Sequence, residues 1–503
     1  WQPVWLYSLP MARRAKIVAT LGPASGSAET LRRLLRAGVD VVRLNLSHGS
    51  REDHHRLIQL VRQVAGEEDR LVPIIADLMG PRFRLGSLPD EGRTLSDGQQ
   101  VTLGAPTTGA EVPIDDSRLL TYLQPGERVL IDNGLVELEI EERDGETLRA
   151  RVTSGGLIAT RKGINLPDTD LPFTVSTKDR DDIRLAVAEG VDYFAASYVG
   201  SAADVEAVRQ EVHRAGGDQL LVAKLERALA VEHLDEIVAA ADASMVARGD
   251  LGVEVPLDTV PVLQKRIVDA GRRLSKPIIV ATQMLESMME HPRPSRAESS
   301  DIANAVFEGA DALMLSGETA AGHYPVQAVE TMARIIQQAE GYEASRHQAL
   351  RNVAGGVDRA ALELFRAAID VASQASDRIP TEIPDAVAEA AVITARRLGV
   401  RCIVAFSQTG FTARLVARFR PANPIAVCTN NIETARRVQL IWGTRPLLVT
   451  EELEHHSQLV QVLERHLLAQ GLVETGDRVV ILMGEPLQDR PRTNLMRVHE
   501  VVG

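Results

Sequence analysis

Two acidic residues, Glu226 and Asp250, offer the clearest chemistry in this 503-residue sequence. Each follows a short apolar run, residues 220–224 and 243–247, of the kind that forms a buried β-strand. Carboxylate oxygens at the ends of neighbouring strands suit Mg²⁺ or Mn²⁺, which keeps several waters and also takes substrate phosphate oxygens as ligands. Since no thiolate or imidazole cluster accompanies them, zinc is disfavoured. We therefore predict a hard divalent metal at Glu226 and Asp250.

Lys224 stands between the first of these strands and Glu226. Only six of the 56 basic residues are lysine, so arginine supplies nearly all the positive charge. A lysine at this place indicates a need for a compact, mobile ammonium group where a planar guanidinium would not serve. The alternative is a structural ion pair between Lys224 and Glu226. Nearby, Gly249 and Gly252 offer backbone NH groups at the start of an expected helix, a possible site for a substrate carboxylate or phosphate.

These residues are positioned by a repeated alternation of strands and helices. We predict strands at residues 16–20, 40–44, 72–77, 192–197, 220–224, 243–247, 277–281 and 311–315. Amphipathic helices are expected between them at residues 29–37, 203–213, 228–240, 257–274 and 326–339. Capping signals at Ser50, Ser176 and Ser201, each with an aspartate three residues later, open three helical stretches. Eight alternations favour a (β/α)8 barrel.

Chemistry in such a barrel sits at the carboxyl ends of the strands, and here these ends are polar. One polar residue after a strand is usually a cap or a surface group. Seven of eight polar ends meeting at one mouth favour an active site. The residues in question are Asn45, Ser47 and His48; Asp77, Arg82 and Arg84; Ser197; Lys224 and Glu226; Arg248 to Asp250; Thr282; and Ser316 with Glu318.

Two further domains interrupt or follow the barrel. Residues 86–171 alternate with period two between Asn-Gly and Asp-Gly turns, which predicts an inserted all-β lid domain. The barrel domain is thus assigned to residues 11–85 and 172–342. A helical connecting segment at 343–383, with an Ala-rich helix near 358–373, leads to a C-terminal α/β domain at 384–503. The fold class is α/β.

Composition excludes several functions. The net charge of −13 argues against a nucleic-acid binder, which needs a basic surface. No apolar run reaches the roughly 18 residues of a membrane helix, and no signal-peptide pattern opens the chain, so we expect a cytoplasmic protein without a membrane partner. Cys402 and Cys428 are expected to be buried and inert, and the histidine pairs 54–55 and 455–456 to be solvated. Residues 1–10 precede a natural-looking start at Met11 and are interpreted as an upstream extension.

Five motifs resemble those of pyruvate kinase. They are KIVATLGPAS at 16–25, VRLNLSHG at 42–49, VARGDLG at 246–252, ATQMLES at 281–287 and MLSGETA at 314–320. The resemblance runs in order from about residue 12 to the C-terminus. It implies the same fold and a reaction in which phosphoenolpyruvate gives its phosphoryl group to ADP.

The resemblance also implies roles for individual residues. Glu226 and Asp250 would bind the divalent metal, and Lys224 would stabilise the phosphoryl group in flight. Thr282 would lie near the carbon that is protonated as the enolate becomes pyruvate. Ser316 and Glu318 would belong to the adjoining proton relay.

The remaining implied contacts concern the substrates. Arg43 would act on the phosphate, with Lys224, Gly249, Asp250 and Thr282 binding phosphoenolpyruvate. On the nucleotide side the implied residues are Asn45, His48 and Arg84 from the barrel, and Lys162 from the lid. Closure of the lid would exclude water from the reaction.

The sequence departs from the family pattern after the third strand. Many members carry DTKGPEIRT there and use a K⁺ ion held partly by the first Asp and Thr, whereas this chain has DLMGPRFRL at 77–85. Arg82 thus stands in place of an acidic residue, near Asn45, Ser47 and Asp77. A fixed guanidinium could replace the monovalent cation, and two cations in one place would repel. We predict that K⁺ is not required.

Other departures and habits of the family bear on positioning and regulation. Gly200 in ASYVG at 196–200 replaces the arginine of the family motif. The stretch SQTGFT at 407–412 resembles the loop that holds a phosphorylated effector in regulated members, although a plain strand-to-helix turn would look similar. Family habit implies a homotetramer.

Two rival functions remain on the residues alone. A lyase that cleaves 2-oxo acids through an enolate would need no lid, no Lys162 and no pair of Arg43 and Arg84. A regulatory paralogue without activity would have lost Lys224, Glu226, Asp250 or Thr282, and all four are present.

Overall fold

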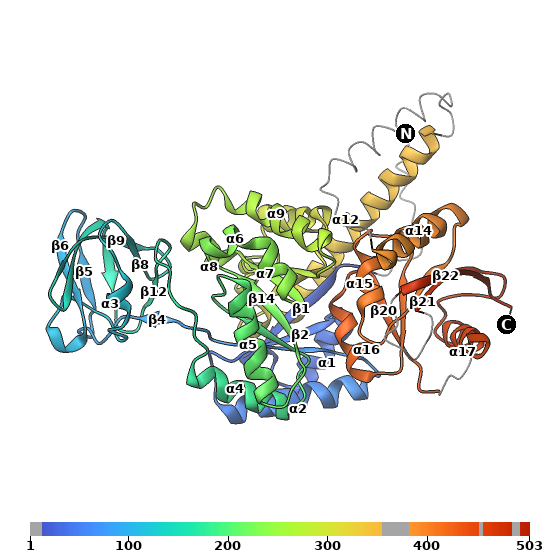
Figure 1. Cartoon of the computed structure of the whole chain (residues 1–503), viewed down its shortest axis with the longest axis horizontal. Helices are drawn as coiled ribbons and strands as arrows, with labels where there is room; N and C mark the ends of the chain where they lie inside the picture. The colour runs from blue at the N-terminus through green and yellow to red at the C-terminus, as the bar shows by residue number, and fades with distance from the viewer. Residues whose placement is uncertain (1–12, 355–381, 452–455, 485–492, 503) are drawn as a thin grey trace. The chain divides into compact units, whose positions relative to one another are not determined.

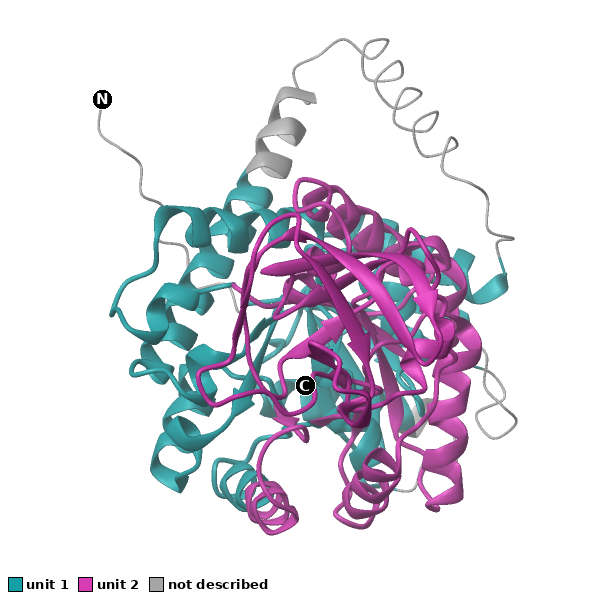
Figure 2. Cartoon of the chain, turned by 90° about the vertical axis from the view of Figure 1, so that its left-hand side faces the viewer, with its two compact units in different colours: residues 1–42, 60–74, 284–503 teal, residues 43–59, 75–283 magenta. Residues whose placement is uncertain are grey.

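The computed structural model describes residues 13–354, 382–451, 456–484 and 493–502. The predicted extension at 1–10 lies outside these residues. Figure 2 shows two compact units, one of residues 1–42, 60–74 and 284–503 and the other of residues 43–59 and 75–283.

A closed parallel barrel confirms the predicted catalytic fold (Figure 1). Its order is β1-β17-β16-β15-β14-β13-β3-β2. The strands are β1 (Lys16–Leu21), β2 (Val41–Asn45), β3 (Ile74–Asp77), β13 (Tyr193–Ala196), β14 (Leu220–Leu225), β15 (Ala243–Ala247), β16 (Ile278–Ala281) and β17 (Ala312–Leu315). Nearly every strand residue is buried, as expected where helices cover the outside of a parallel sheet. All eight predicted strands are confirmed to within two residues at each end.

Helices connect the barrel strands. They are α1 (Ala28–Ala37), α2 (Arg51–Glu67), α4 (Thr177–Ala188), α5 (Ala202–Arg214), α6 (Ala228–Glu232), α7 (Leu234–Ala240), α8 (Arg248–Glu254), α9 (Val260–Arg273), α10 (Arg296–Glu308), α11 (Gly317–Ala320) and α12 (Pro325–Ala354), with short 3-10 turns at Pro23–Ser25 and Glu286–Met289. Capping boxes open α4 at Ser176 and α5 at Ser201, as predicted. Ser50 and Asp53 also exchange hydrogen bonds at the start of α2. The single helix predicted at 228–240 is wrong, because the backbone of His233 leaves the helical region and divides it in two.

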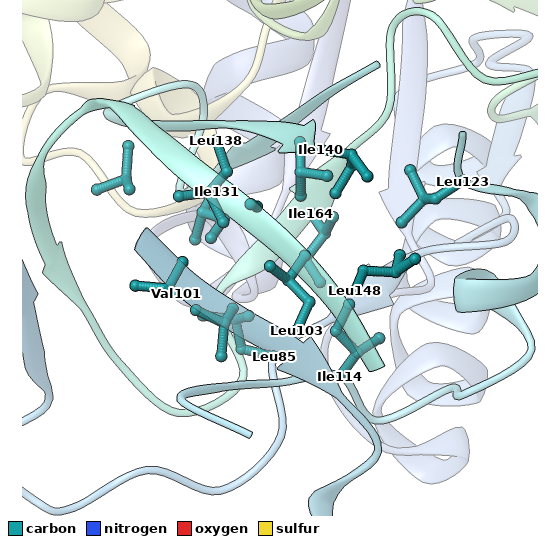
Figure 3. Packing of buried hydrophobic residues seen from close by; sticks show 14 of the residues in the cluster. Leu85, Val101, Leu103, Ile114, Leu123, Ile131, Leu138, Ile140, Leu148 and Ile164 are labelled. Atoms are coloured by element: carbon teal, nitrogen blue, oxygen red, sulfur yellow. The ribbon is translucent and has the colours of Figure 1, made fainter. Parts of the chain in front are cut away.

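The β-rich insertion begins after β3 and forms its own sheet, in the order β4-β12-β8-β9-β10-β6-β7. Its elements are β4 (Phe83–Arg84), β5 (Arg93–Leu95), β6 (Gln100–Gly104), β7 (Val112–Pro113), α3 (Leu119–Tyr122), β8 (Arg128–Ile131), β9 (Val136–Asp144), β10 (Thr147–Ser154), β11 (Gly156–Ile158) and β12 (Gly163–Asn165), with a 3-10 turn at Pro106–Thr108. Alternate residues such as Leu138, Ile140 and Leu148 face one core (Figure 3). The chain enters through β4 and leaves through β12, and these two strands pair with each other.

The C-terminal region forms a five-stranded sheet in the order β20-β19-β18-β21-β22, parallel except for β22. Its elements are α14 (Ile383–Leu398), β18 (Cys402–Phe406), α15 (Phe411–Ala417), β19 (Ile425–Thr429), α16 (Ile432–Arg437), a 3-10 turn at Val438–Leu440, β20 (Thr444–Leu448), α17 (His456–Ala469), β21 (Arg478–Gly484) and β22 (Thr493–Glu500). Separate apolar clusters pack on its two faces. The mostly parallel α/β domain is as predicted. The helix predicted at 358–373 lies outside the described residues.

Smaller predictions have mixed outcomes. Cys402 and Cys428 are buried as expected, and burial raises the pKa of each thiol to about 12, which disfavours the reactive thiolate. His55 is exposed, but the prediction of a solvated His54 is wrong, because its ring is buried beneath the start of α2. Of the other pair, His455 lies outside the described residues. None of the described helices has the length and apolarity needed to cross a membrane.

Candidate active site

A buried charge network joins four strand ends of the barrel. Asp77, the last residue of β3, accepts a 2.6 Å hydrogen bond from Arg43 Nε on β2. Lys224 Nζ, on β14, lies 2.7 Å from Ser197 Oγ, 2.6 Å from Glu226 Oε1 and 3.4 Å from Asp77 Oδ1. All of these side chains are less than a tenth exposed. The ammonium group is therefore held at one point by three oxygen-bearing groups.

The charges of this network move the pKa values of Asp77 and Lys224 in the direction that keeps both side chains ionised. Burial alone would raise the pKa of Asp77, but Arg43 and Lys224 hold it below its ordinary value. Burial would likewise lower the pKa of Lys224, and the carboxylates of Asp77 and Glu226 raise it instead. Lys224 is thus a permanent cation at the barrel mouth.

Glu226 is the most buried carboxylate of the site. Its Oε2 accepts a 2.9 Å hydrogen bond from the Tyr198 backbone NH, and Oε1 pairs with Lys224. Burial raises the pKa of Glu226 to about 7, with Lys224 opposing the rise and the negative charge of Asp250 adding to it. Asp250, in the first turn of α8, therefore lies close enough for mutual repulsion with Glu226.

This pair fits a hard divalent cation. A cation between Glu226 and Asp250 would offset their repulsion, and oxygen donors alone suit Mg²⁺ or Mn²⁺. Within the described residues there is no group of three or more His, Cys, Asp or Glu side chains placed to hold a metal. A cation here would complete its coordination with water and substrate oxygens, as magnesium commonly does.

Arg82 lies beside this acidic pair. Its guanidinium carbon is 5.8 Å from the centre of the Tyr198 ring, which is cation–π distance. Partial burial alone would lower the pKa of Arg82, but Tyr198 and the carboxylates Asp250, Glu226 and Asp77 raise it. Asp77, one of the predicted neighbours of Arg82, therefore interacts with it electrostatically. Asn45 and Ser47 bond to each other, Asn45 Oδ1 accepting from Ser47 N at 3.1 Å.

The end of β16 is strained. Thr282 and Gln283 have φ values of 69° and 54°, a left-handed region that is unfavourable for a β-branched residue such as threonine. The strained loop is held by Arg248, whose Nη2 donates to Thr282 O at 2.6 Å. Thr282 Oγ1 in turn accepts a 2.8 Å bond from the Gly249 backbone NH. Strain of this kind persists where the surroundings fix a side chain for function.

Two of the predicted nucleotide-side residues, Arg84 and Lys162, line one cavity of about 220 Å³, whereas Asn45 and His48 are not part of its wall. Arg82, Arg84, Lys162 and Asp250 all contribute to its wall. Lys162 Nζ pairs with Asp132 Oδ2 at 2.7 Å. His48 is exposed in the loop after β2. The cavity thus carries four cationic side chains, those of Arg82, Arg84, Arg161 and Lys162, which suits a polyphosphate ligand.

Ser316 and Glu318 follow β17 and belong to the other compact unit. The Glu318 side chain is buried, and its two oxygens accept backbone hydrogen bonds from Leu285 N at 3.0 Å and Ser316 N at 2.7 Å. These bonds fix the loop after β17. The predicted proton-relay role of both residues stays a prediction.

Sequence reasoning gave no role to Tyr198 or Arg248. Tyr198 supports Arg82 with its ring and Glu226 with its backbone NH, and it has a positive φ of 62°. Neither contact leaves a signal in the sequence. Arg248 directly precedes Gly249 and Asp250, so its place in that motif could have marked it as a support for Thr282.

Together, fold and site define an α/β barrel whose mouth carries a buried network of lysine, arginine and carboxylate side chains. Residues 12–329 match the family model "Pyruvate kinase, barrel domain", and residues 385–499 match "Pyruvate kinase, alpha/beta domain". The chain belongs to the pyruvate kinase family, whose members are phosphotransferases (EC 2.7.1.40).

Three relatives span almost the whole chain, and each is named pyruvate kinase. That of Methylorubrum extorquens is 40% identical over 97% of this chain and 97% of its own length. That of Mycobacterium tuberculosis is 38% identical over 98% of this chain and 99% of its own. That of Geobacillus stearothermophilus is 38% identical, covering 98% of this chain and 81% of its own.

Proposed function

We propose that this chain transfers the phosphoryl group of phosphoenolpyruvate to ADP, giving pyruvate and ATP, with Mg²⁺ or Mn²⁺ bound by Glu226 and Asp250. The observation that carries the proposal is Lys224, held at 2.6 Å from Glu226 and 2.7 Å from Ser197. Its fixed ammonium group is suited to neutralise a phosphoryl group in transit, because it needs little reorganisation during the reaction.

The other residues orient the substrates around Lys224. Arg43 is fixed by Asp77 and would bind the phosphate, while the bound divalent cation would supply charge that offsets the phosphate and enolate oxygens. On the nucleotide side, Arg84, Lys162, Asn45 and His48 would hold the ADP phosphates and leave its terminal oxygen facing the phosphoryl group.

Protonation of the enolate would take place beside Thr282. The hydroxyl group of Thr282 donates to Ala281 O at 2.6 Å and accepts from Gly249 N, so its position is fixed. We assign Thr282 to the proton-transfer step, with Ser316 and Glu318 in the relay that supplies the proton.

The proposed reaction does not require K⁺. Arg82 places a permanent positive charge in the field of Asp77, Glu226 and Asp250, where a monovalent cation would otherwise be attracted. A second cation at that place would be repelled.

Regulation and assembly form a further part of the proposal. The stretch at 407–412 follows β18 and leads into α15, where it would hold a phosphorylated effector. Thr412 Oγ1 is bonded to Thr493 Oγ1 at 2.7 Å, which ties this turn to β22. The expected assembly is a homotetramer, which analytical ultracentrifugation would test.

The deciding experiment is a coupled assay of pyruvate formation from phosphoenolpyruvate and ADP with Mg²⁺, run beside Lys224→Met. We expect ADP-dependent turnover in the wild type and its near loss in the variant. Undiminished activity of Lys224→Met would remove Lys224 from the mechanism. Pyruvate release from a larger 2-oxo acid without ADP would instead favour the lyase.

A further inference from the structure

Arg227, the residue after Glu226, is a buried arginine outside the site described above. Its side chain is 7% exposed, and Nη2 donates a 3.2 Å hydrogen bond to Thr169 O. Thr169 lies in the segment that returns from β12 of the lid to α4 of the barrel. The guanidinium therefore links the strand end that bears Glu226 to the lid's return segment.

Glu254 makes a second link to the same segment. It ends α8, the helix that carries Asp250, and is 5% exposed. Its Oε1 accepts from Asn165 Nδ2 at 3.4 Å, and Oε2 accepts from Ala228 N at 3.3 Å. Burial raises the pKa of Glu254, and the charge of Arg227 opposes that rise. The residue after Glu226, Arg227, and the last residue of the helix that carries Asp250, Glu254, thus both contact the lid's return segment.

The lid holds the same segment from its own side. Thr169 Oγ1 donates to Glu127 Oε2 at 2.8 Å, and Asp168 forms a two-pronged pair with Arg128, both bonds being 2.8 Å long. Residues 165–169 are therefore bonded to the lid by Glu127 and Arg128, and to the barrel by Arg227 and Glu254.

The surroundings of Arg227 and Glu254 are otherwise mostly apolar. A small cavity of about 30 Å³ is walled by the two chain segments that enter and leave the lid, together with Tyr198, Arg227 and Glu254. Burying two charges costs desolvation that their mutual attraction only partly offsets, so an apolar pair of similar size would stabilise the fold at least as well. Stability alone therefore does not explain why Arg227 and Glu254 are charged.

Gly200 makes room for this guanidinium. A Cβ atom at Gly200 would lie 3.3 Å from Arg227 Nη1 and 2.9 Å from Leu229 Cδ2, so a side chain there would crowd both. Gly200 is also the position where the motif of the resembling family has an arginine. In this chain the guanidinium of Arg227 lies beside the backbone position at which that motif has its arginine.

We infer that Arg227, in the field of Glu254, is a positioning residue that couples the lid to the two metal-ligand strand ends. It binds the lid's return segment to the chain beside Glu226 and Asp250, so that lid movement and the geometry of the metal ligands change together. The kinetic part of this inference rests on the proposed function, whereas the structural part does not.

Hydrogen–deuterium exchange in the absence of substrate tests the coupling directly. In Arg227→Met we expect amides of residues 163–172 to exchange about 10-fold faster, the effect of losing a charge-assisted hydrogen bond. The matched control is Arg209→Met, since Arg209 also pairs with a carboxylate, Asp242 at 3.0 Å, and with a carbonyl, Ala240 O at 2.7 Å. Exchange at 163–172 that is unchanged in Arg227→Met, or equally fast in Arg209→Met, overturns the inference.

Kinetics and a swapped arginine complete the test. Arg227→Met should raise the KM for ADP more than it lowers kcat, and the double variant Gly200→Arg with Arg227→Met should bring both exchange and KM back toward wild type. If the double variant is as perturbed as Arg227→Met, an arginine at position 200 cannot replace Arg227. If Arg227→Met fails to fold, Glu254→Gln is measured in the same way, and wild-type exchange in that variant contradicts the coupling. Absence of wild-type turnover would count against the proposed function alone, because the exchange result stands without substrate.

Discussion

Reversing the charge of Arg82 gives the sharpest test of potassium independence. The guanidinium lies 5.8 Å from the Tyr198 ring centre, in the field of Asp250, Glu226 and Asp77. If a carboxylate is taken at about 6 Å from the guanidinium, the two unit charges interact by about 3 kcal/mol at an effective dielectric constant of about 20. Because the Arg82 side chain is exposed to solvent, screening reduces this to about 1 kcal/mol. Arg82→Glu loses that attraction and adds a similar repulsion, a change of about 2 kcal/mol or roughly 30-fold in rate.

The assay is pyruvate formation in tetramethylammonium buffer with and without KCl at constant ionic strength. We expect the wild type to change by less than about 2-fold, and Arg82→Glu to be about 30-fold slower without K⁺ and to recover when K⁺ is added. Arg184→Glu is the control, because Arg184 is an exposed arginine of α4 paired with Asp181 at 2.7 Å. Strong activation of the wild type by KCl would refute the reasoning, and so would an Arg82→Glu variant that K⁺ fails to rescue.

Four further predictions follow from the same geometry. Lys224→Met should lower kcat by about 1000-fold and also lower the melting temperature, because Asp77 and Glu226 lose a buried positive partner; steady-state kinetics with calorimetry would check both. Thr282→Ala should slow proton exchange into the methyl group of pyruvate by about 100-fold, measured by NMR in D₂O; unchanged exchange would clear Thr282 of that step. Lys162→Ala should raise the KM for ADP by about 10-fold and leave that for phosphoenolpyruvate unchanged. Burial lowers the pKa of Lys16 from 10.5 to about 8, so folding disfavours its charged form and stability due to Lys16 should rise between pH 8 and 10.5. At pH 7 the wild type should melt below Lys16→Met, because it carries the disfavoured buried charge. At pH 10 the difference between the two melting temperatures should be smaller.

Local pattern was enough to predict the barrel. Buried parallel strands are formed by short, mostly apolar runs. A run such as residues 243–247 is too short and too uniformly apolar to be an amphipathic helix, so it predicts a buried strand. The break at His233 was not predictable, because residues 228–240 have helical composition throughout and only the backbone of His233 interrupts them. Tertiary packing of the two short helices overrides local propensity there.

The meeting of Asp77, Ser197, Lys224 and Glu226 was also predictable, because parallel strands bring their carboxyl ends to one mouth. The interactions among them were not. The pattern marked Lys224 and Glu226 but gave no way to tell a structural ion pair from a catalytic ammonium, and the 2.6 Å pair in the structure is compatible with both. What favours catalysis is the third group, Asp77, since an ion pair needs only one carboxylate. The positive φ of Thr282 could not be predicted from the sequence either. Threonine is β-branched and favours the extended backbone of a strand, so a left-handed turn is not expected at this residue.

The balance of charge around Lys224 links the potassium and metal predictions. Asp77, Glu226 and Asp250 carry three negative charges when ionised, and Arg43, Lys224 and Arg82 carry three positive ones, so the set is formally neutral. A bound divalent cation then adds two positive charges, which a doubly charged phosphate brings back to neutrality. With an acidic residue in place of Arg82 the same set would be two charges more negative, and one monovalent cation would offset half of that difference. We therefore predict that the identity of residue 82 decides whether a monovalent cation is needed at the site when phosphate is bound, and that Arg82 removes that need.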